Sequence, residues 1–229
     1  MEKPQEGGWM KGEFTMNDHG MSLDAMSAFL EARLSRPLPG SAAHTSMFPL
    51  TAGGIRFKYI TTMPQREGSV LILLYEDEGG LYFPLIKRPA YPGVHGGQVS
   101  LPGGKAEPGE TPVETALREG EEEIGIVSHK VKVIGQMTGF NVAVSSIFIT
   151  PVVGIYTERP EFRPDPREVE RVLVFSVSKL QKQEEVLSRE VRSNGSTPLI
   201  APHFEIDEEI VWGATAMVMN EFRMVLRGD

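Results

Sequence analysis

Short apolar runs separated by polar turns fill most of the chain, and their spacing predicts a sequence of secondary-structure elements. Ser22–Leu34 carries apolar residues at helical spacing behind a serine suited to cap a helix, so we expect a helix there. From Ile55 onward the runs become shorter and are broken by turn residues, which is typical of strands. The expected strands are IRFKYI (55–60), SVLILLYE (69–76), LYFPLIKR (81–88), KVKVIGQM (130–137), SIFITPVVGIY (146–156) and RVLVFSV (171–177).

The order of these elements indicates the fold class. DEGG (77–80) predicts a hairpin turn, and AMVMNEFRMVL (216–226) predicts a helix near the end of the chain. Strands, an acidic helix, further strands and a terminal helix together favour a layered α/β domain with a mixed sheet. We expect residues 1–22 to be a flexible arm and residues 23–229 to form one domain that includes the first helix.

The charge balance narrows the classes of partner. The formal net charge of -8 argues against binding to nucleic acid or to an anionic membrane, because both repel an acidic surface. It leaves small phosphorylated ligands open, since a bound divalent cation reverses the local sign. The chain has no cysteine, which excludes disulfides and thiolate sites. It also has no apolar stretch of bilayer length and no secretory signal pattern, so we expect a cytoplasmic protein.

Leu101–Ile126 is unusually acidic: it contains seven glutamates against Lys105 and Arg118. Thr111 and Glu114 have the spacing of a capping box, with Pro112 at the first helical position. Gly125 is suited to end the helix in the left-handed conformation. We therefore expect a helix from about Pro112 to Ile124.

Three carboxylates of this helix lie on one face. Glu119, Glu122 and Glu123 are spaced i, i+3 and i+4 towards the C-terminal end, where both like-charge repulsion and the helix dipole oppose them. A solvated acidic face is one explanation. A site for Mg²⁺ or Mn²⁺ is the other, because hard cations take oxygen ligands and share them with substrate phosphates.

The loop before the helix decides between them. Gly104, Glu110, Arg118–Glu119, Glu122–Glu123 and Gly125–Ile126 meet every fixed position of a known signature. The chain thereby resembles the Nudix hydrolases, and that resemblance implies an α/β/α sandwich and metal-dependent hydrolysis of nucleoside diphosphate derivatives. Gly120 departs from the pattern, since the family has a bulkier apolar residue there; a glycine inside a helix suggests tight packing.

The resemblance implies a role for each matching residue. Glu119, Glu122 and Glu123 would bind the metal together with the Gly103 carbonyl, and Glu119 would help to deprotonate a bound water. Arg118 would hold a glutamate in place, and Glu110 would brace the loop against the helix.

A further acidic residue outside the signature is expected in many family members. Glu168 and Glu170 are the candidates here, as a base or an extra ligand, with Glu168 preferred. Both could equally be surface residues at the start of a strand.

Leu85–Gly104 resembles the additional motif of the coenzyme A pyrophosphatase branch of the family. Arg88, His95 and Gln98 are among its matches, and we take them as candidate substrate contacts. Three positions depart: Pro89 replaces a small polar residue, Gly93 stands where an arginine is expected, and Leu101 replaces a phenylalanine. The alternatives are an exposed arginine at a strand end for Arg88 and structural hydrogen bonding for the other two. Trp212, in a flanking stretch that also resembles the branch, is expected in the core.

These features predict cleavage of coenzyme A or acyl-coenzyme A into 3',5'-ADP and 4'-phosphopantetheine or its acyl form. ADP-ribose, another nucleoside diphosphate derivative or a nucleoside triphosphate is the alternative substrate. A ligand sensor without turnover and an acidic protein-interaction domain are the alternatives outside enzymology. We expect a small nucleotide-derived partner, with a homodimer as one candidate oligomeric state.

Overall fold

The computed structural model describes residues 21–51, 66–92, 95–142, 145–192 and 198–229. The arm expected at residues 1–22 and the strand expected at 55–60 lie almost entirely outside these ranges. The helices are α1 (Leu23–Leu34), α2 (Ser41–Ser46), α3 (Pro112–Ile124), the 3₁₀ turn η1 (Ser128–Lys130), α4 (Val177–Lys182) and α5 (Gly213–Arg227). The strands are β1 (Leu50–Thr51), β2 (Arg66–Asp77), β3 (Gly80–Lys87), β4 (Val99–Ser100), β5 (Gly103–Lys105), β6 (Val131–Gln136), β7 (Phe140–Val142), β8 (Ile147–Tyr156), β9 (Arg171–Ser176), β10 (Leu187–Val191), β11 (Leu199–Ile206) and β12 (Glu209–Trp212).

A mixed sheet forms the centre of the molecule. Within the described residues it has eight strands, with β4-β3-β2-β8-β6 as its main path and β5, β7 and β9 pairing at its sides. Strands β2 and β8 run parallel, whereas the other pairs in this sheet are antiparallel. The predicted hairpin is confirmed, because Asp77 pairs with Gly80 across the turn between β2 and β3.

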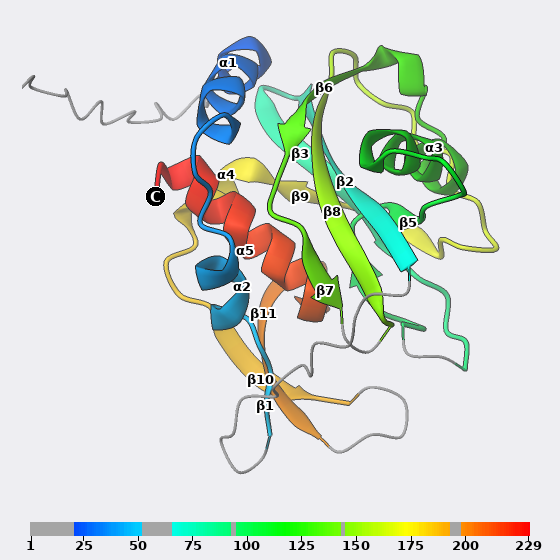
Figure 1. Cartoon of the computed structure of the whole chain (residues 1–229), viewed down its shortest axis with the longest axis vertical. Helices are drawn as coiled ribbons and strands as arrows, with labels where there is room; N and C mark the ends of the chain where they lie inside the picture. Colours follow the sequence, from blue (N-terminus) through cyan, green and yellow to red (C-terminus); the bar gives the residue numbers. More distant parts are fainter. Residues whose placement is uncertain (1–20, 52–65, 93–94, 143–144, 193–197) are drawn as a thin grey trace, which may run out of the picture.

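Helices cover both faces of this sheet, as Figure 1 shows: α3 lies on one side, and α1 and α5 lie on the other. Alternate residues of β2 explain the arrangement. Leu71 and Leu73 pack with Ala116 of α3, whereas Ile72 and Leu74 belong to the core shared with α1 and α5. A strand buried on both faces needs an almost continuous apolar run, which is what residues 70–75 supply. The predicted α/β/α sandwich is confirmed.

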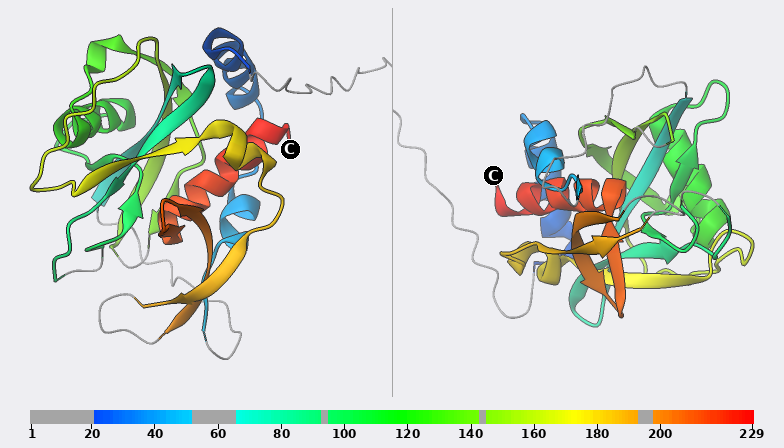
Figure 2. Two further views of the ribbon diagram at one scale, coloured as in Figure 1. Left: turned by 180° about the vertical axis from the view of Figure 1, so that it is seen from behind. Right: turned by 90° about the horizontal axis from the view of Figure 1, so that it is seen from below.

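A second, smaller antiparallel sheet was not expected. Strand β11 pairs with β1, β10 and β12, and the sheet extends beyond α2 and α5 (Figures 1 and 2). It joins a segment before β2 to segments after β9. The segments that flank the central sheet in the sequence therefore assemble with each other in space.

A buried polar cluster connects those flanking segments. Glu221 of α5 is fully buried and accepts hydrogen bonds from the Gly40 amide (3.0 Å) and from the ring of His44 (Nε2 to Oε2, 2.9 Å). Asn220 donates to the Ala43 carbonyl at 2.9 Å. Helix α2 is thus held on α5 by satisfied polar groups, which a buried carboxylate requires.

Within the described residues, no helix has the length and apolar content needed to cross a bilayer.

Candidate active site

Local signals set the ends of helix α3. The Thr111 hydroxyl accepts from the Glu114 amide (3.3 Å), and the Glu114 carboxylate accepts from the Thr111 amide (2.8 Å). Pro112 occupies the first turn, and Gly125 ends the helix with φ at 70°. The predicted helix and its capping box are confirmed.

Gly120 faces the sheet, and a β-carbon there would lie 2.8 Å from Ile126 Cδ1 and 3.1 Å from Leu71 Cδ2. The tight packing expected from this glycine is present. The missing side chain allows α3 to approach Leu71 of β2 closely at this position.

Arg118 connects the helix to the loop before it. Its Nε donates to Glu110 Oε1 at 2.7 Å, and its Nη2 donates to Glu110 Oε2 (3.0 Å) and to the Lys105 carbonyl (2.9 Å). These hydrogen bonds, with one from the Glu107 amide, lower the pKa of Glu110 to about 2. The bracing role expected for Glu110 is what the geometry shows.

Two of the three predicted metal ligands share the remaining nitrogen of Arg118. Its Nη1 lies 3.0 Å from Glu119 Oε1 and 3.0 Å from Glu122 Oε2. The Glu119 side chain is 13% exposed and that of Glu122 is 60% exposed. Burial raises the pKa of Glu119 despite the neighbouring guanidinium. Gly104 leaves room for this carboxylate, since a β-carbon there would lie 2.4 Å from the Glu119 carboxyl carbon and would displace it.

Glu123 has the most unusual environment of the three. It is 1% exposed, and its Oε2 accepts a hydrogen bond from the Gly103 amide at 2.7 Å. Its Oε1 is buried and has no hydrogen-bond partner among the described residues. Burial raises the pKa of Glu123 to about 7, although Arg88 and the Gly103 amide act in the opposite direction.

Arg88 points into this region from the end of β3. Its Nε donates to Ser100 Oγ at 3.2 Å, and its Nη2 donates to the Gly103 carbonyl at 3.2 Å. The same nitrogen lies 3.4 Å from Glu123 Oε1. Arg88 is therefore not the exposed strand-end arginine of the alternative interpretation. Ser100 holds its guanidinium, a role that sequence reasoning did not assign.

His95 and Gln98 follow Arg88 in the chain, and their side chains contact each other. His95 Nδ1 is 3.3 Å from Gln98 Oε1, and the Gln98 carbonyl accepts from the Arg88 amide at 3.0 Å. This is the structural hydrogen bonding considered above, and it leaves a substrate role for either residue as a prediction. Trp212 is half-buried at the start of α5.

The structure separates the two acidic candidates after β8. The Asp165 amide donates to the Glu123 carbonyl at 3.0 Å, and the Glu168 amide donates to the Asp165 carbonyl at 3.0 Å, so the turn that carries Glu168 lies beside the end of α3. The charge of Glu168 contributes to the raised pKa of both Glu119 and Glu123. The Glu170 amide donates to the Lys87 carbonyl at 2.8 Å, and its side chain is exposed. Glu168 is brought to the site, and no contact places the Glu170 side chain there among the described residues.

The carboxylates of the signature and the Gly103 carbonyl are oxygen ligands of the kind that a divalent cation takes. In the structure they are hydrogen-bonded to separate protein groups. Among the described residues, no three acidic or imidazole groups lie close enough to form a complete metal site. Arg118 brings Glu119 and Glu122 together on one nitrogen, whereas Glu123 is held separately by the Gly103 amide. The buried Oε1 of Glu123, which accepts no hydrogen bond from the part of the chain that the structure describes and has Arg88 Nη2 at 3.4 Å, is the feature that a hard cation would satisfy.

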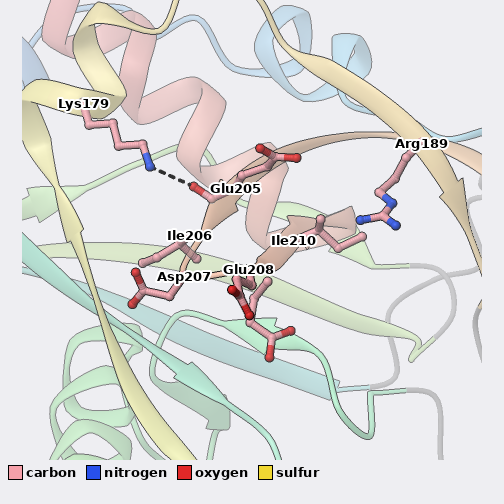
Figure 3. A pocket seen from close by; sticks show the side chains of 8 residues that line it. Lys179, Arg189, Glu205, Ile206, Asp207, Glu208 and Ile210 are labelled. Atoms are coloured by element: carbon pink, nitrogen blue, oxygen red, sulfur yellow. Dashed lines mark hydrogen bonds between the residues drawn. The ribbon is translucent and has the colours of Figure 1, made fainter.

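A pocket of about 290 Å³ lies elsewhere, around the β11–β12 hairpin (Figure 3). Its walls come from α4, β10 and the hairpin, and Lys179 donates to the Glu205 carbonyl at its edge. None of the residues predicted for the active site lines it. The candidate site is thus defined by converging polar groups and not by this cavity.

A comparison with known protein families matches residues 65–193 to the NUDIX domain, which is more than half of the chain. The chain belongs to the Nudix family. The match covers all strands of the central sheet (β2 to β9) and helix α3, and it extends to β10 of the smaller sheet.

Curated Nudix relatives agree. Nudix hydrolase 22, chloroplastic, from Arabidopsis thaliana is 37% identical over 163 residues, which is 67% of this chain and 53% of the relative. Nudix hydrolase 15, mitochondrial, from the same plant is 36% identical over 182 residues, covering 76% of this chain and 61% of the relative. This chain spans between about half and three fifths of their lengths.

A solved structure shows the same fold. The crystal structure of the Nudix hydrolase RenU from M. smegmatis superposes with a TM-score of 0.51 at 16% identity, over 79% of this chain and 94% of that one. At this identity the likeness concerns the fold alone. The Nudix family is shown by these comparisons, whereas the substrate is not.

Proposed function

We propose that this chain is a metal-dependent Nudix pyrophosphohydrolase that cleaves coenzyme A or acyl-coenzyme A. The products would be 3',5'-ADP and 4'-phosphopantetheine or its acyl form. The observation that carries the hydrolytic part is the buried carboxylate of Glu123, with one oxygen on the Gly103 amide and the other without a hydrogen bond. Desolvating a carboxylate in this way costs stability, so a binding role explains what a structural role does not.

The chain's own residues supply the remaining parts of the mechanism. Glu119, Glu122, Glu123 and the Gly103 carbonyl would hold Mg²⁺ or Mn²⁺, which when bound neutralises the diphosphate and acidifies a coordinated water. Arg118 keeps Glu119 and Glu122 within reach of each other through a single nitrogen.

Proton transfer and substrate binding require further groups. Glu119 is partly desolvated, which suits it to accept the proton of the attacking water, and Glu168, in the turn beside the end of α3, would be a second acceptor. The water oxygen bonds to phosphorus, the bridging P–O bond breaks, and the released phosphate oxygen leaves on the other product. Arg88 would then exchange its contact with the Gly103 carbonyl for a substrate phosphate oxygen.

Coenzyme A is preferred as substrate because of the motif that ends in the signature loop. Its arginine, Arg88, donates both to its serine, Ser100, and to the Gly103 carbonyl. The arginine expected within the motif is replaced by Gly93, so a phosphate contact from that position is lost. ADP-ribose or another nucleoside diphosphate derivative is therefore the second candidate.

Product analysis tests the proposal. The purified chain is incubated with Mg²⁺ or Mn²⁺ and, separately, with coenzyme A, acetyl-coenzyme A, ADP-ribose, NADH and nucleoside triphosphates, and the products are identified by mass. We expect 3',5'-ADP from the coenzyme A samples at the highest kcat/KM, and no product when the metal is chelated. Exclusive cleavage of ADP-ribose would overturn the choice of substrate and leave the reaction class intact.

A charge-removing variant tests the proposed metal ligands directly. Glu122 is exposed, so Glu122→Gln leaves folding unaffected while removing a proposed ligand. We expect its turnover to fall by about 100-fold or more. Near-normal turnover would show that the signature glutamates are not the metal site.

A further inference from the structure

Glu209 lies outside the matched Nudix region, at the start of β12, and it contacts two strands of the central sheet. Its Oε2 is 2.6 Å from Lys87 Nζ on β3, and its Oε1 is 3.0 Å from Arg171 Nη2 on β9. The Glu209 side chain is 24% exposed. Burial alone would raise the pKa of Glu209, but the two cations lower it overall, so the group is a carboxylate.

The two cations would repel each other without this carboxylate. Lys87 and Arg171 are directly paired across the β3–β9 ladder. Like charges directly opposite on neighbouring strands are destabilising. Glu209 places one oxygen on each, so it removes the repulsion at the last pair of this ladder.

The same end of the ladder carries residues of the candidate active site. Arg88 follows Lys87 directly and contacts the Gly103 carbonyl and Glu123. The Glu170 amide, next to Arg171, donates to the Lys87 carbonyl at 2.8 Å, and Glu168 lies three residues before Arg171. A displacement of this ladder end therefore moves Arg88 and Glu168 relative to helix α3.

We propose that Glu209 is a positioning residue: it fixes the end of the β3–β9 ladder so that Arg88 reaches Glu123 and the Gly103 carbonyl, and so that the turn carrying Glu168 stays beside the end of α3. The inference rests on the proposed function, because the positioned groups are those assigned to substrate and proton transfer. It gives the C-terminal hairpin, which no part of the Nudix signature includes, a role in the reaction.

The test compares Glu209→Gln with Glu208→Gln in the full chain. Both variants remove one negative charge from the same hairpin, and the Glu208 side chain is exposed in the turn. We expect Glu209→Gln to lower kcat/KM by about tenfold and Glu208→Gln to change it by less than about twofold. Equal values for the two variants would overturn the proposal.

Two combinations separate positioning from a general loss of stability. When Arg88 is already replaced by alanine, Glu209→Gln should change the logarithm of kcat/KM by less than half as much as it does alone, because the residue being positioned is absent. Adding Lys87→Gln to Glu209→Gln should restore part of the lost activity, since it removes the repulsion at its source. An undiminished effect of Glu209→Gln in both combinations would show a merely structural role.

Hydrogen exchange provides a readout that does not depend on activity. We expect Glu209→Gln, and not Glu208→Gln, to speed exchange at the Arg88 and Glu170 amides, which bond to Gln98 and Lys87. An inactive wild-type chain would defeat the proposed function, and the exchange rates would still decide whether Glu209 holds the ladder. An active wild type with unchanged exchange in Glu209→Gln would defeat the positioning role alone.

Discussion

At the scale of single residues, Glu123 shows the conflict between stability and chemistry at this site. Its carboxylate is 1% exposed, and one oxygen lacks a hydrogen bond among the described residues. A glutamine of the same shape would avoid the cost of burying a charge and keep an acceptor for the Gly103 amide, and it would give up the ion pair that Arg88 makes at 3.4 Å.

We therefore predict opposite effects of Glu123→Gln on stability and activity. In metal-free buffer at pH 8, the free energy of unfolding in urea should be higher for the variant than for the wild type by about 1 to 3 kcal/mol. Its turnover with Mg²⁺ should fall by at least about 100-fold. Urea unfolding and initial rates on the same preparation check both parts. A variant that is less stable by several kcal/mol would show that Glu123 serves the fold.

Tyr75 allows a prediction of pH dependence away from the site. It is 3% exposed, and burial, with a contribution from Asp77, raises its pKa to about 12 from 10. The folded chain then retains the phenolic proton at a pH where the unfolded chain loses it, so stability is full below pH 10 and falls as the pH rises towards 12. Between pH 10 and pH 11 we expect the free energy of unfolding to fall by about 1 kcal/mol more in the wild type than in Tyr75→Phe. Urea unfolding at the two pH values measures this difference, with Tyr91→Phe, at an exposed position, as the control. Parallel losses in wild type and Tyr75→Phe would contradict it.

At the scale of elements, helix α3 was predictable because its signals are local. The capping box, Pro112 and Gly125 each act within a few residues, and the helix begins and ends where they place it. The long strands β2 and β8 were also predictable, since burial on both faces leaves continuous apolar runs.

The smaller elements were not predictable for equally physical reasons. Helix α2 spans six residues after Gly40 and has no side-chain cap. Strand β10 is mostly exposed and polar, and β11 contains Pro202 and a buried His203. These elements form through contacts between segments that are distant in the sequence, such as the pairing of Leu50 with Ile200, and no local pattern reveals such contacts. For the same reason the ion pairs of Glu209 were missed, whereas the signature glutamates were found.

Gly120 gives a prediction at the element scale, where helix preference and packing oppose each other. Leucine favours a helix over glycine by roughly 0.8 kcal/mol, so propensity alone would make Gly120→Leu stabilising. A β-carbon there already meets Ile126 at 2.8 Å, and overpacking a core typically costs about 1–3 kcal/mol. We expect a net loss of about 1–2 kcal/mol in urea unfolding. Gly109→Ala, in the loop before α3, would not serve as a control, because its φ of 91° strains any side chain. Ala214→Gly in α5 instead measures the cost of glycine relative to alanine in a helix of this chain. A stabilised Gly120→Leu chain would show that α3 is free to move away from β2.

At the scale of the whole molecule, the catalytic fold and its flanking segments share one core. Leu30 of α1 and Phe222 of α5 are fully buried, and both belong to the cluster that contains Ile72 and Phe83 of the central sheet. Phe83 also contacts Phe222 with ring centroids 6.1 Å apart. Of the residues matched to the Nudix domain, helix α3 covers one face of the sheet, whereas the short helix α4 is the matched helix on the other face, where α1 and α5 also pack.

This shared core predicts that residues 65–193 do not fold alone. Without α1 and α5, the face that carries Ile72, Leu74 and Phe83 would be exposed to water, at about 25 cal/mol for each Å² of apolar surface. Domains of this size are stable by only about 5–15 kcal/mol, so the loss of that face should abolish cooperative unfolding. Residues 23–229 should instead unfold cooperatively and close to the urea midpoint of the full chain, because they keep Leu30, Phe222 and the sheet face between them. The loss of the Ser22 cap of α1 should cost about 1 kcal/mol. Near-ultraviolet circular dichroism and urea titration of the two fragments compare these expectations. A cooperative transition in the 65–193 fragment would show that the flanking helices are an added layer, and that the domain boundary lies inside the range 23–229.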